Sequence, residues 1–304
     1  MSDNSLLTDE QLKVIRAKLD KLCDESDTTV FADIYKFQKE HLEYMGQHYS
    51  GCMNQFEMYF SATVNAGLNI NYLDKKAWPD HRALQFTIAT HSLKQFFSAY
   101  NLLNDGAYED AIALLRSVYE AFLRIIFASC NPKKAYNAYT MAGQTGVKFN
   151  ATNLVDNELK LDWNNYKIMS AFTHSNLFNV LETMTNIAQK GQKEPITLTY
   201  EVNKDMISIV MNYISFLMWV FLRLFSEVFV VDYSQHKSKE AIKEHVDLLS
   251  EYAGVASFAV KNHTVSKYWR QVGGDIDKIF ELMHYMDANP AADWKKQWKE
   301  IQVK

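Results

Sequence analysis

Three ionisable side chains recur every four residues in a segment that is otherwise apolar. They are Arg116, Glu120 and Arg124 in the stretch 111–130, and their spacing places them on one face of a helix. Ile, Leu, Val, Phe and Tyr occupy the other faces, which is the pattern of a helix packed into a core. Glu120 can pair with both arginines, and the remaining positive charge must be balanced by solvent, another side chain or an anionic ligand.

Two interpretations of this charged stripe (Arg116, Glu120 and Arg124) are open. Because the guanidinium fork of arginine binds phosphate and carboxylate groups, the stripe predicts a cationic pocket. The alternative is structural, an ion-pair network within one helix that borders a crevice between helices. A functional pocket requires that the stripe be at least partly open to water.

A second polar stripe follows some fifty residues later, in the sequence YKIMSAFTHSN. Tyr166, Ser170 and His174 again recur every four residues, and Asn176 adds hydrogen-bonding capacity beside them. Histidine is the usual general acid or base near neutral pH, and Ser170 or Tyr166 can orient it. The structural alternative is a histidine that is hydrogen-bonded in the core.

An arginine beside a histidine suits the cleavage of a phosphodiester. The arginine stabilises the developing negative charge, and the histidine moves a proton. We therefore predict that Arg116, Glu120 and His174 form a catalytic set lining one polar pocket, because buried polar groups seek one another. The predicted ligand-binding residues around this set are Arg124, Tyr166, Ser170 and Asn176.

The sequence offers no metal or cofactor motif. His41 and His48 lie seven residues apart and lack a carboxylate at ligand spacing, and Gly273-Gly274 stands alone as a turn. Three widely spaced cysteines indicate a reducing compartment. The N-terminus is acidic and polar, without the apolar core of a signal peptide, so we expect a cytoplasmic protein that needs no metal or cofactor.

Composition and periodicity predict an all-α fold. The 304 residues include only 10 glycines and 4 prolines, and 48% are hydrophobic, which favours long helices around a substantial core. The net charge of −4 gives no general attraction to nucleic acid. We expect an N-terminal helical region (1–79), a central helical bundle (80–231) and a C-terminal helical extension (232–304), with the N-terminal helices packing on the bundle or mediating self-association.

Several helix boundaries can be predicted from local signals. Asp80 resembles an N-cap, Asn104–Gly106 is a turn signal, and Asn131-Pro132 stops the stripe helix, so the helices on either side of the turn form a short hairpin. Gly46 and Gly51 are candidate breaks in the long N-terminal stretch. The apolar spacing predicts helices over about 8–23, 30–66, 81–103, 107–130, 133–143, 163–189, 201–231, 236–252 and 275–288, and a tail that docks through Trp294 and Trp298.

The segment 201–231 is the most apolar of these helices. Its uninterrupted apolar run is shorter than the roughly 20 residues that a membrane span needs, because Asn212, Arg223 and Glu227 interrupt it. Apolar residues cover all of its faces, as in a helix surrounded by other helices. We therefore expect the central, most buried helix of a soluble bundle and no membrane span.

The stretch NDGAYEDAIALLRSVYEAFLRIIF, followed by YKIMSAFTHSN, resembles a loose group of uncharacterised bacterial helical proteins. The group is similar to the wider HEPN-like superfamily, in which several members are RNases of toxin and antiphage systems. The resemblance covers roughly 85–231 and implies that Arg116, Glu120, Ser170 and His174 are the family-typical polar positions. HEPN nucleases carry the arginine and the histidine on one helix, whereas here the two come from different helices.

Two classes of function follow from these patterns. The first is a bacterial antiphage-defence or toxin-type protein, an RNase or nucleotide-binding protein with an Arg/His site. The second is a non-enzymatic helical interaction or sensor module whose polar stripe is structural. The segregated polar stripes favour the first class. The absence of a basic surface and of an Arg–His motif on one helix favours the second.

Overall fold

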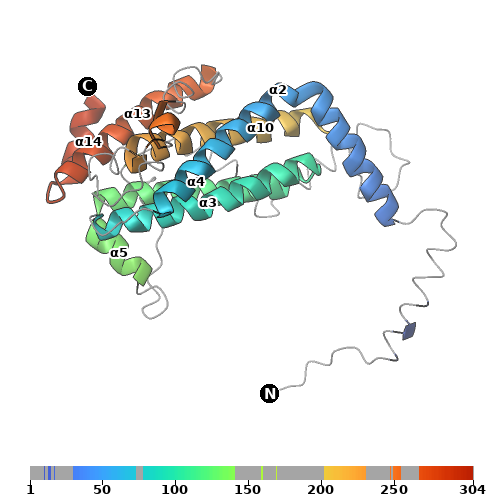
Figure 1. Cartoon of the computed structure of the whole chain (residues 1–304), viewed down its shortest axis with the longest axis horizontal. Helices are drawn as coiled ribbons and strands as arrows, with labels where there is room; N and C mark the ends of the chain where they lie inside the picture. The colour runs from blue at the N-terminus through green and yellow to red at the C-terminus, as the bar shows by residue number, and fades with distance from the viewer. Residues whose placement is uncertain are drawn as a thin grey trace.

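The computed structural model describes residues 30–72, 78–140, 202–230, 249–254 and 267–303, together with a few single positions outside these ranges. Within this part of the chain all regular structure is helical and no strand occurs, which confirms the all-α fold. The helices pack side by side as an elongated bundle (Figure 1). Of the predicted helices, 8–23 and 163–189 lie almost wholly outside the described residues, and 236–252 does so in large part.

The first long helix, α2 (Val30–Tyr72), continues without interruption for 43 residues. The predictions that Gly46 or Gly51 would break it and that it would end near Ala66 were wrong. A single glycine costs a helix interior only about 1 kcal/mol, which the packing of a long helix outweighs. Both glycines face open space, so no contact at these positions depends on the missing side chain.

Helices α3 (Asp80–Asn104) and α4 (Tyr108–Cys130) form the predicted antiparallel hairpin. Asp80 is the first helical residue and not the N-cap, because Pro79 has extended backbone angles and its carbonyl accepts the first hydrogen bonds of α3. The turn between the helices needs Gly106, whose φ of 78° disfavours any side chain. A Cβ atom there would also lie 2.6 Å from the Phe37 ring of α2.

The remaining helices complete the bundle. α5 (Pro132–Thr140) begins at a proline, which is well suited to the first position of a helix. α10 (Lys204–Arg223) runs directly into a π-helix, η2 (Leu224–Val230). α13 (Lys267–Ala288) begins earlier than predicted, and α14 (Trp294–Val303) follows it after a short turn.

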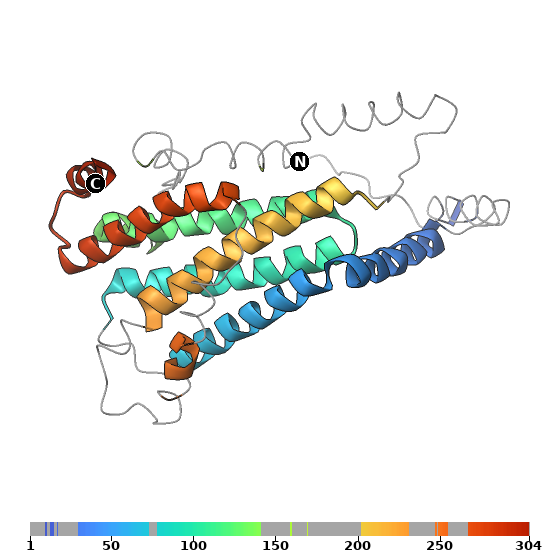
Figure 2. The same ribbon diagram turned by 90° about the horizontal axis from the view of Figure 1, so that it is seen from above.

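One hydrophobic core joins residues from all three predicted regions, from Met45 in α2 to Ile301 in α14. α10 crosses diagonally among α2, α3 and α4 (Figure 2), and all its residues from Phe216 to Arg223 are buried. The expectation of a central, buried helix is therefore confirmed. Trp294 and Trp298 are also buried, so the docking of the tail through these aromatics is confirmed.

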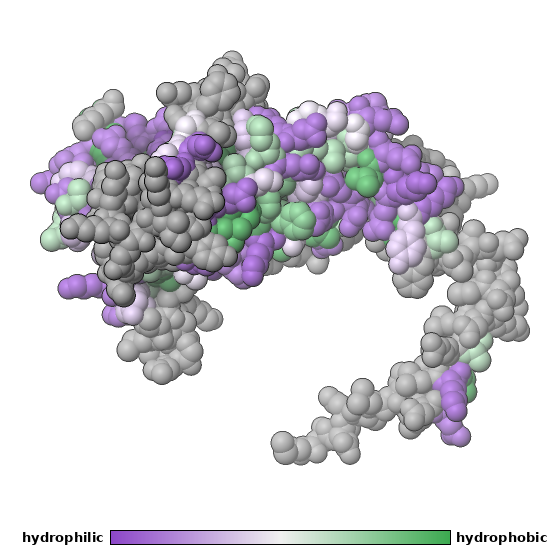
Figure 3. Space-filling model, viewed as in Figure 1, coloured by the Kyte–Doolittle hydropathy of each residue, from purple (hydrophilic) through white to green (hydrophobic). Residues whose placement is uncertain are grey.

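One helix in the described part of the chain, Lys204–Val230, is long and apolar enough to cross a membrane. In the bundle, 78% of its most apolar window is buried, which is also typical of the core helix of a soluble protein. The face of the molecule shown in Figure 3 is largely hydrophilic where residues are described, and hydrophobic side chains reach the surface in small groups.

A buried polar network ties α3 to α4 and α13. The amide of Gln85 donates hydrogen bonds to the Ile125 carbonyl and to Ser129 Oγ, both at 2.8 Å. Its oxygen accepts from Arg82 Nη1 at 2.6 Å, and Arg82 Nη2 donates to Asp287 Oδ2 at 2.5 Å. Arg82 and Gln85 are both buried, so folding removes their contacts with water. The hydrogen bonds of this network replace those contacts.

The carboxylate at the end of this network is held in its charged form. Burial opposes ionisation of Asp287, but His81 and Arg82 outweigh it and lower the pKa of the carboxyl below its ordinary value of 3.8. A carboxylate with a depressed pKa stabilises the fold above that value, and the contribution is lost as the pH falls through the folded-state pKa. The ion pair is therefore intact at neutral pH.

We expect Asp287→Asn to lower the free energy of unfolding by about 3 kcal/mol at pH 7, because it removes a carboxylate that pairs with the buried Arg82. Asp277→Asn on the same helix is the matched control. Asp277 pairs with the buried Arg223, but its own side chain is 67% exposed and Arg223 keeps its two hydrogen bonds to Glu227, so the loss should stay below about 1 kcal/mol. Urea unfolding at neutral pH measures both, and equal losses would contradict the assignment.

Candidate functional site

The charged stripe lies on α4, where the sequence places it. Arg116 Nε donates to Glu120 Oε1 at 3.1 Å, and Arg124 Nη2 lies 3.7 Å from Glu120 Oε2. The side chains are 19%, 25% and 37% exposed for Arg116, Glu120 and Arg124, respectively. Most other residues of α4 are buried, so the stripe belongs to the face of this helix that reaches solvent, together with the exposed Glu109 and Asp110 in its first turn.

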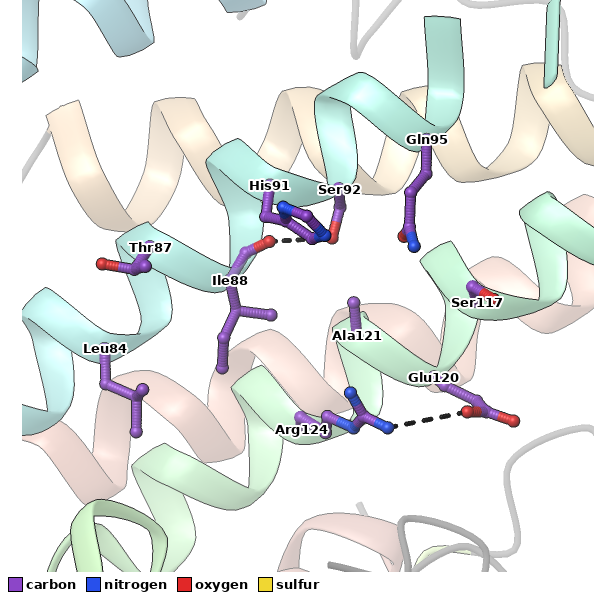
Figure 4. A pocket seen from close by; sticks show the side chains of 10 residues that line it. All are labelled: Leu84, Thr87, Ile88, His91, Ser92, Gln95, Ser117, Glu120, Ala121 and Arg124. Carbon is purple, nitrogen blue, oxygen red and sulfur yellow. Dashed lines mark hydrogen bonds and ion pairs between the residues drawn. The ribbon is translucent and has the colours of Figure 1, made fainter. Parts of the chain in front are cut away.

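Two residues of the stripe, Glu120 and Arg124, line a groove between α3 and α4 (Figure 4). The groove has a volume of about 340 Å³, which is at the small end of the range for ligand sites. α3 contributes one wall and α4 the other, and Glu120 and Arg124 belong to the α4 wall. The lining residues are Leu84, Thr87, Ile88, His91, Ser92, Gln95, Ser117, Glu120, Ala121 and Arg124.

Few of the polar groups in this groove are available to a ligand. The hydroxyls of Thr87 and Ser92 donate to carbonyls one turn earlier in α3, and Ser117 does the same in α4. His91 and Gln95, in contrast, make no hydrogen bond to another described residue. A ligand would therefore meet an imidazole and an amide on one wall, and an ion pair on the other.

Arg124 has an incomplete set of hydrogen bonds. Its Nε is buried and has no acceptor among the described residues, although the guanidinium as a whole is partly exposed. Figure 4 shows the guanidinium turned toward the groove, with the pair to Glu120 on one side. An Nε and an Nη on the same edge of a guanidinium form the fork that binds carboxylate or phosphate in bidentate fashion.

The structure brings together only part of the predicted site. Arg116, Glu120 and Arg124 form one paired stripe on α4, as their spacing predicts. The residues predicted on the second stripe, Tyr166, Ser170, His174 and Asn176, lie outside the described residues. A common pocket of Arg116, Glu120 and His174 therefore stays a prediction.

Sequence reasoning missed His91 as a groove residue. No other candidate metal ligand lies at a suitable spacing from His91, and its neighbours in sequence, Thr90 and Ser92, are ordinary polar residues. The sequence around His91 therefore did not indicate a binding role. The signal was available in the hairpin: residues equally distant from a tight turn lie across from one another in antiparallel helices. His91 and Glu120 are nearly equidistant from the turn at Asp105 and Gly106, and both line the groove.

Two further groups of the described chain, the Cys130 thiol and the Arg223 guanidinium, fit structural roles. Burial raises the pKa of the Cys130 thiol to about 12, so it is protonated and a poor nucleophile at neutral pH. Arg223 is buried between Trp219 and Phe280 and pairs with Glu227 and Asp277. Among the described residues no group of three His, Cys, Asp or Glu side chains is arranged to hold a metal ion.

No family model matches the chain, and neither the curated proteins nor the solved structures contain a match. The class that the structure itself defines is an all-α bundle with a polar groove on its central hairpin.

We expect Glu120→Gln to lower the free energy of unfolding by less than about 1 kcal/mol, because solvent screens a partly exposed ion pair. Glu227→Gln is the matched comparison: the same i, i+4 geometry holds Arg223, whose side chain is only 9% exposed. There the loss should be at least about 2 kcal/mol. Thermal and urea unfolding measure both variants. A loss for Glu120→Gln as large as that for Glu227→Gln would show that the stripe is sealed and structural.

Proposed function

We propose that the α3–α4 groove binds an anionic group of RNA or of a nucleotide, and that the protein is a bacterial antiphage-defence or toxin-type protein. The observation that supports this most directly is Arg124. It presents a partly exposed guanidinium to the groove while its buried Nε has no acceptor among the described residues. A phosphate oxygen would supply that acceptor and also balance the charge of the fork.

The opposite wall of the groove complements a nucleotide. Gln95 offers both a donor and an acceptor, as recognition of a base edge requires. Leu84, Ile88 and Ala121 provide apolar surface for a flat ring. The volume of about 340 Å³ suits one nucleotide unit and not a longer stretch of chain.

Catalysis is a further part of the proposal. In RNA cleavage the ribose 2′-hydroxyl attacks the phosphorus, the bond to the 5′-oxygen breaks, and a 2′,3′-cyclic phosphate forms. A histidine takes the proton from the hydroxyl while water protonates the leaving 5′-oxygen, or the histidine protonates that oxygen while water takes the hydroxyl proton, and an arginine stabilises the charge on the phosphate. Arg116 or Arg124 can serve as the arginine, and His174 or His91 as the histidine.

A specific observation favours the second class of function, a non-enzymatic helical interaction or sensor module. The three charges of the stripe pair within α4, and the groove hydroxyls are bonded to their own helices. Tyr35 and Leu42, which α2 leaves exposed, would then contribute to self-association through the N-terminal helices. A cytoplasmic location belongs to both proposals.

Arg124→Gln tests ligand binding without removing a buried ion. We expect it to weaken the binding of adenosine monophosphate and of inorganic phosphate at least about tenfold, which corresponds to the loss of one charge-assisted bidentate contact. Lys94→Gln, which removes the same charge from an exposed site of α3 outside the groove, should leave the affinity unchanged. Titration calorimetry measures both. Equal affinities for the wild type and Arg124→Gln would exclude the groove as the anion site.

The two histidines separate catalysis from binding. We expect His91→Ala or His174→Ala to abolish RNA cleavage, toxicity on expression or phage restriction, and the active histidine variant should melt within a few degrees of the wild type. His48→Ala, an exposed histidine of α2, is the control and should retain full activity. If His91→Ala, His174→Ala and the double variant all leave the three activities intact, the protein is not an RNase that depends on either histidine, and the interaction module is the better proposal.

A further inference from the structure

A histidine far from the groove links three parts of the bundle. His41 of α2 is fully buried, and both of its ring nitrogens make hydrogen bonds. Nδ1 lies 2.9 Å from the Asn104 carbonyl at the end of α3, and Nε2 lies 2.8 Å from the Tyr108 hydroxyl at the start of α4. The same hydroxyl oxygen is 3.2 Å from the backbone nitrogen of Asn203.

Because a carbonyl can only accept, the donor and the acceptor of each hydrogen bond around His41 can be assigned. A carbonyl only accepts, so His41 Nδ1 carries a proton and donates to the Asn104 oxygen. In the neutral ring Nε2 is then an acceptor, and Tyr108 must donate to it. The Tyr108 oxygen in turn accepts the N–H of Asn203, so every group has one partner of the right kind.

This series of hydrogen bonds, from Asn104 through His41 and Tyr108 to Asn203, ends at the first turn of α10. Asn203 is the N-cap of that helix, and its side-chain oxygen accepts from the backbone nitrogens of Asp205 and Met206 at 3.1 Å each. The histidine has little room to move, because the Phe37 ring packs against Gly106 and beside the imidazole. The N-terminal end of α10 is therefore held to α2 through one imidazole and one phenol.

Protonation would reverse one of these bonds. With a proton on Nε2, both His41 and Asn203 would donate toward the Tyr108 oxygen, and the Tyr108 hydroxyl would lose its acceptor. A positive charge would also be buried, which is unfavourable unless a carboxylate offsets it. We propose that His41 is a proton-sensitive latch, which holds the N-terminal end of α10 in place when neutral and releases it when protonated.

The charged and titratable surroundings support a neutral ring. Burial lowers the pKa of His41 from its ordinary value of 6.5, and this outweighs the Asn104 carbonyl and the charge of Asp105, which act in the opposite direction. On α10, Lys204 lies 6.0 Å from the centre of the Tyr44 ring and adds positive charge on that side. Within the described part of the chain, the titratable groups around the latch on the turn, α2, α4 and α10 are Asp105, Tyr44, Tyr49, Tyr108 and Lys204.

The sign and size of the effect follow from linkage. In an opened state His41 is hydrated and titrates near 6.5, whereas in the closed state its pKa is lower. The latch therefore contributes stability at and above pH 6.5, and that contribution is lost as the pH falls below 6.5 toward the closed-state pKa. In that window the open population rises by up to about tenfold for each pH unit.

Hydrogen exchange of the whole protein at pH 7.5 and 5.5 tests the latch. After correction for intrinsic exchange rates, the amides of Asn203, Met206 and Ile207 should lose protection by up to about tenfold more at the lower pH than the amide of the buried Ile279 in α13. His41→Gln should remove this difference, because its amide can donate to Asn104 and accept from Tyr108 but does not titrate. His48→Gln, on an exposed site of α2, should leave the difference unchanged.

Two outcomes would overturn the latch. One is equal protection of the three α10 amides in the wild type at both pH values, and the other is an undiminished pH response in His41→Gln. If His41→Gln does not fold, the nitrogen chemical shifts of His41 in the wild type decide. The latch requires a ring protonated only on Nδ1 at pH 7.5, and a pKa of His41 below its ordinary value of 6.5. None of these measurements involves the α3–α4 groove, so their result is independent of the proposed ligand.

Discussion

The turn between α3 and α4 is the constraint on which the rest of the described structure depends. Gly106 adopts a backbone conformation that closes the hairpin in a minimum of residues, and the Phe37 ring fills the space where a side chain would be. Because the turn is short, it restricts how far α3 and α4 can slide along one another. The hydrogen bond from the Gln85 amide to the Ile125 carbonyl holds the two helices in the observed alignment. That register decides which side chains meet across the groove, and the carbonyl of Asn104 at the same turn receives the His41 proton.

Three arginines of the bundle illustrate how burial dictates pairing. Arg82 and Arg223 are buried, and each has a carboxylate from α13 within contact, because an unpaired charge at these positions would cost several kcal/mol. Arg124 is more exposed, and the carboxylate within its reach, Glu120, lies closer to Arg116. Water can solvate what Glu120 does not neutralise. The buried arginines therefore differ from Arg124 in their access to solvent, and only the partly exposed guanidinium of Arg124 is within reach of an external anion among these three.

Much of this fold could be predicted from the sequence because helix periodicity is local. The hairpin, the buried segment 201–231 and the docking tryptophans follow from apolar spacing and turn signals. Residues whose environment depends on distant segments could not be predicted in this way. Arg82 follows Asp80 and His81 in sequence, yet it is buried and pairs with Asp287 of α13. Gln85 is buried against Ile125 and Ser129 of α4. For the same reason His91 was overlooked, since its place in the groove depends on the register of the hairpin, whereas the stripe on α4 was visible because its members share one helix.

The positions of the three charges in the stripe determine how an anion could approach Arg124. An anion that approaches Arg124 meets the carboxylate of Glu120, which would repel it while Glu120 stays between the two arginines. Arg116 holds the same carboxylate from the other side at the shorter distance of 3.1 Å, so Glu120 can turn toward Arg116 and remain paired. If the groove binds an anion as proposed, Arg116 would therefore act as a positioning residue, which holds the carboxylate while the fork of Arg124 donates to the external oxygen. A single Arg124–Glu120 pair without Arg116 would leave the carboxylate no alternative partner on this face of α4.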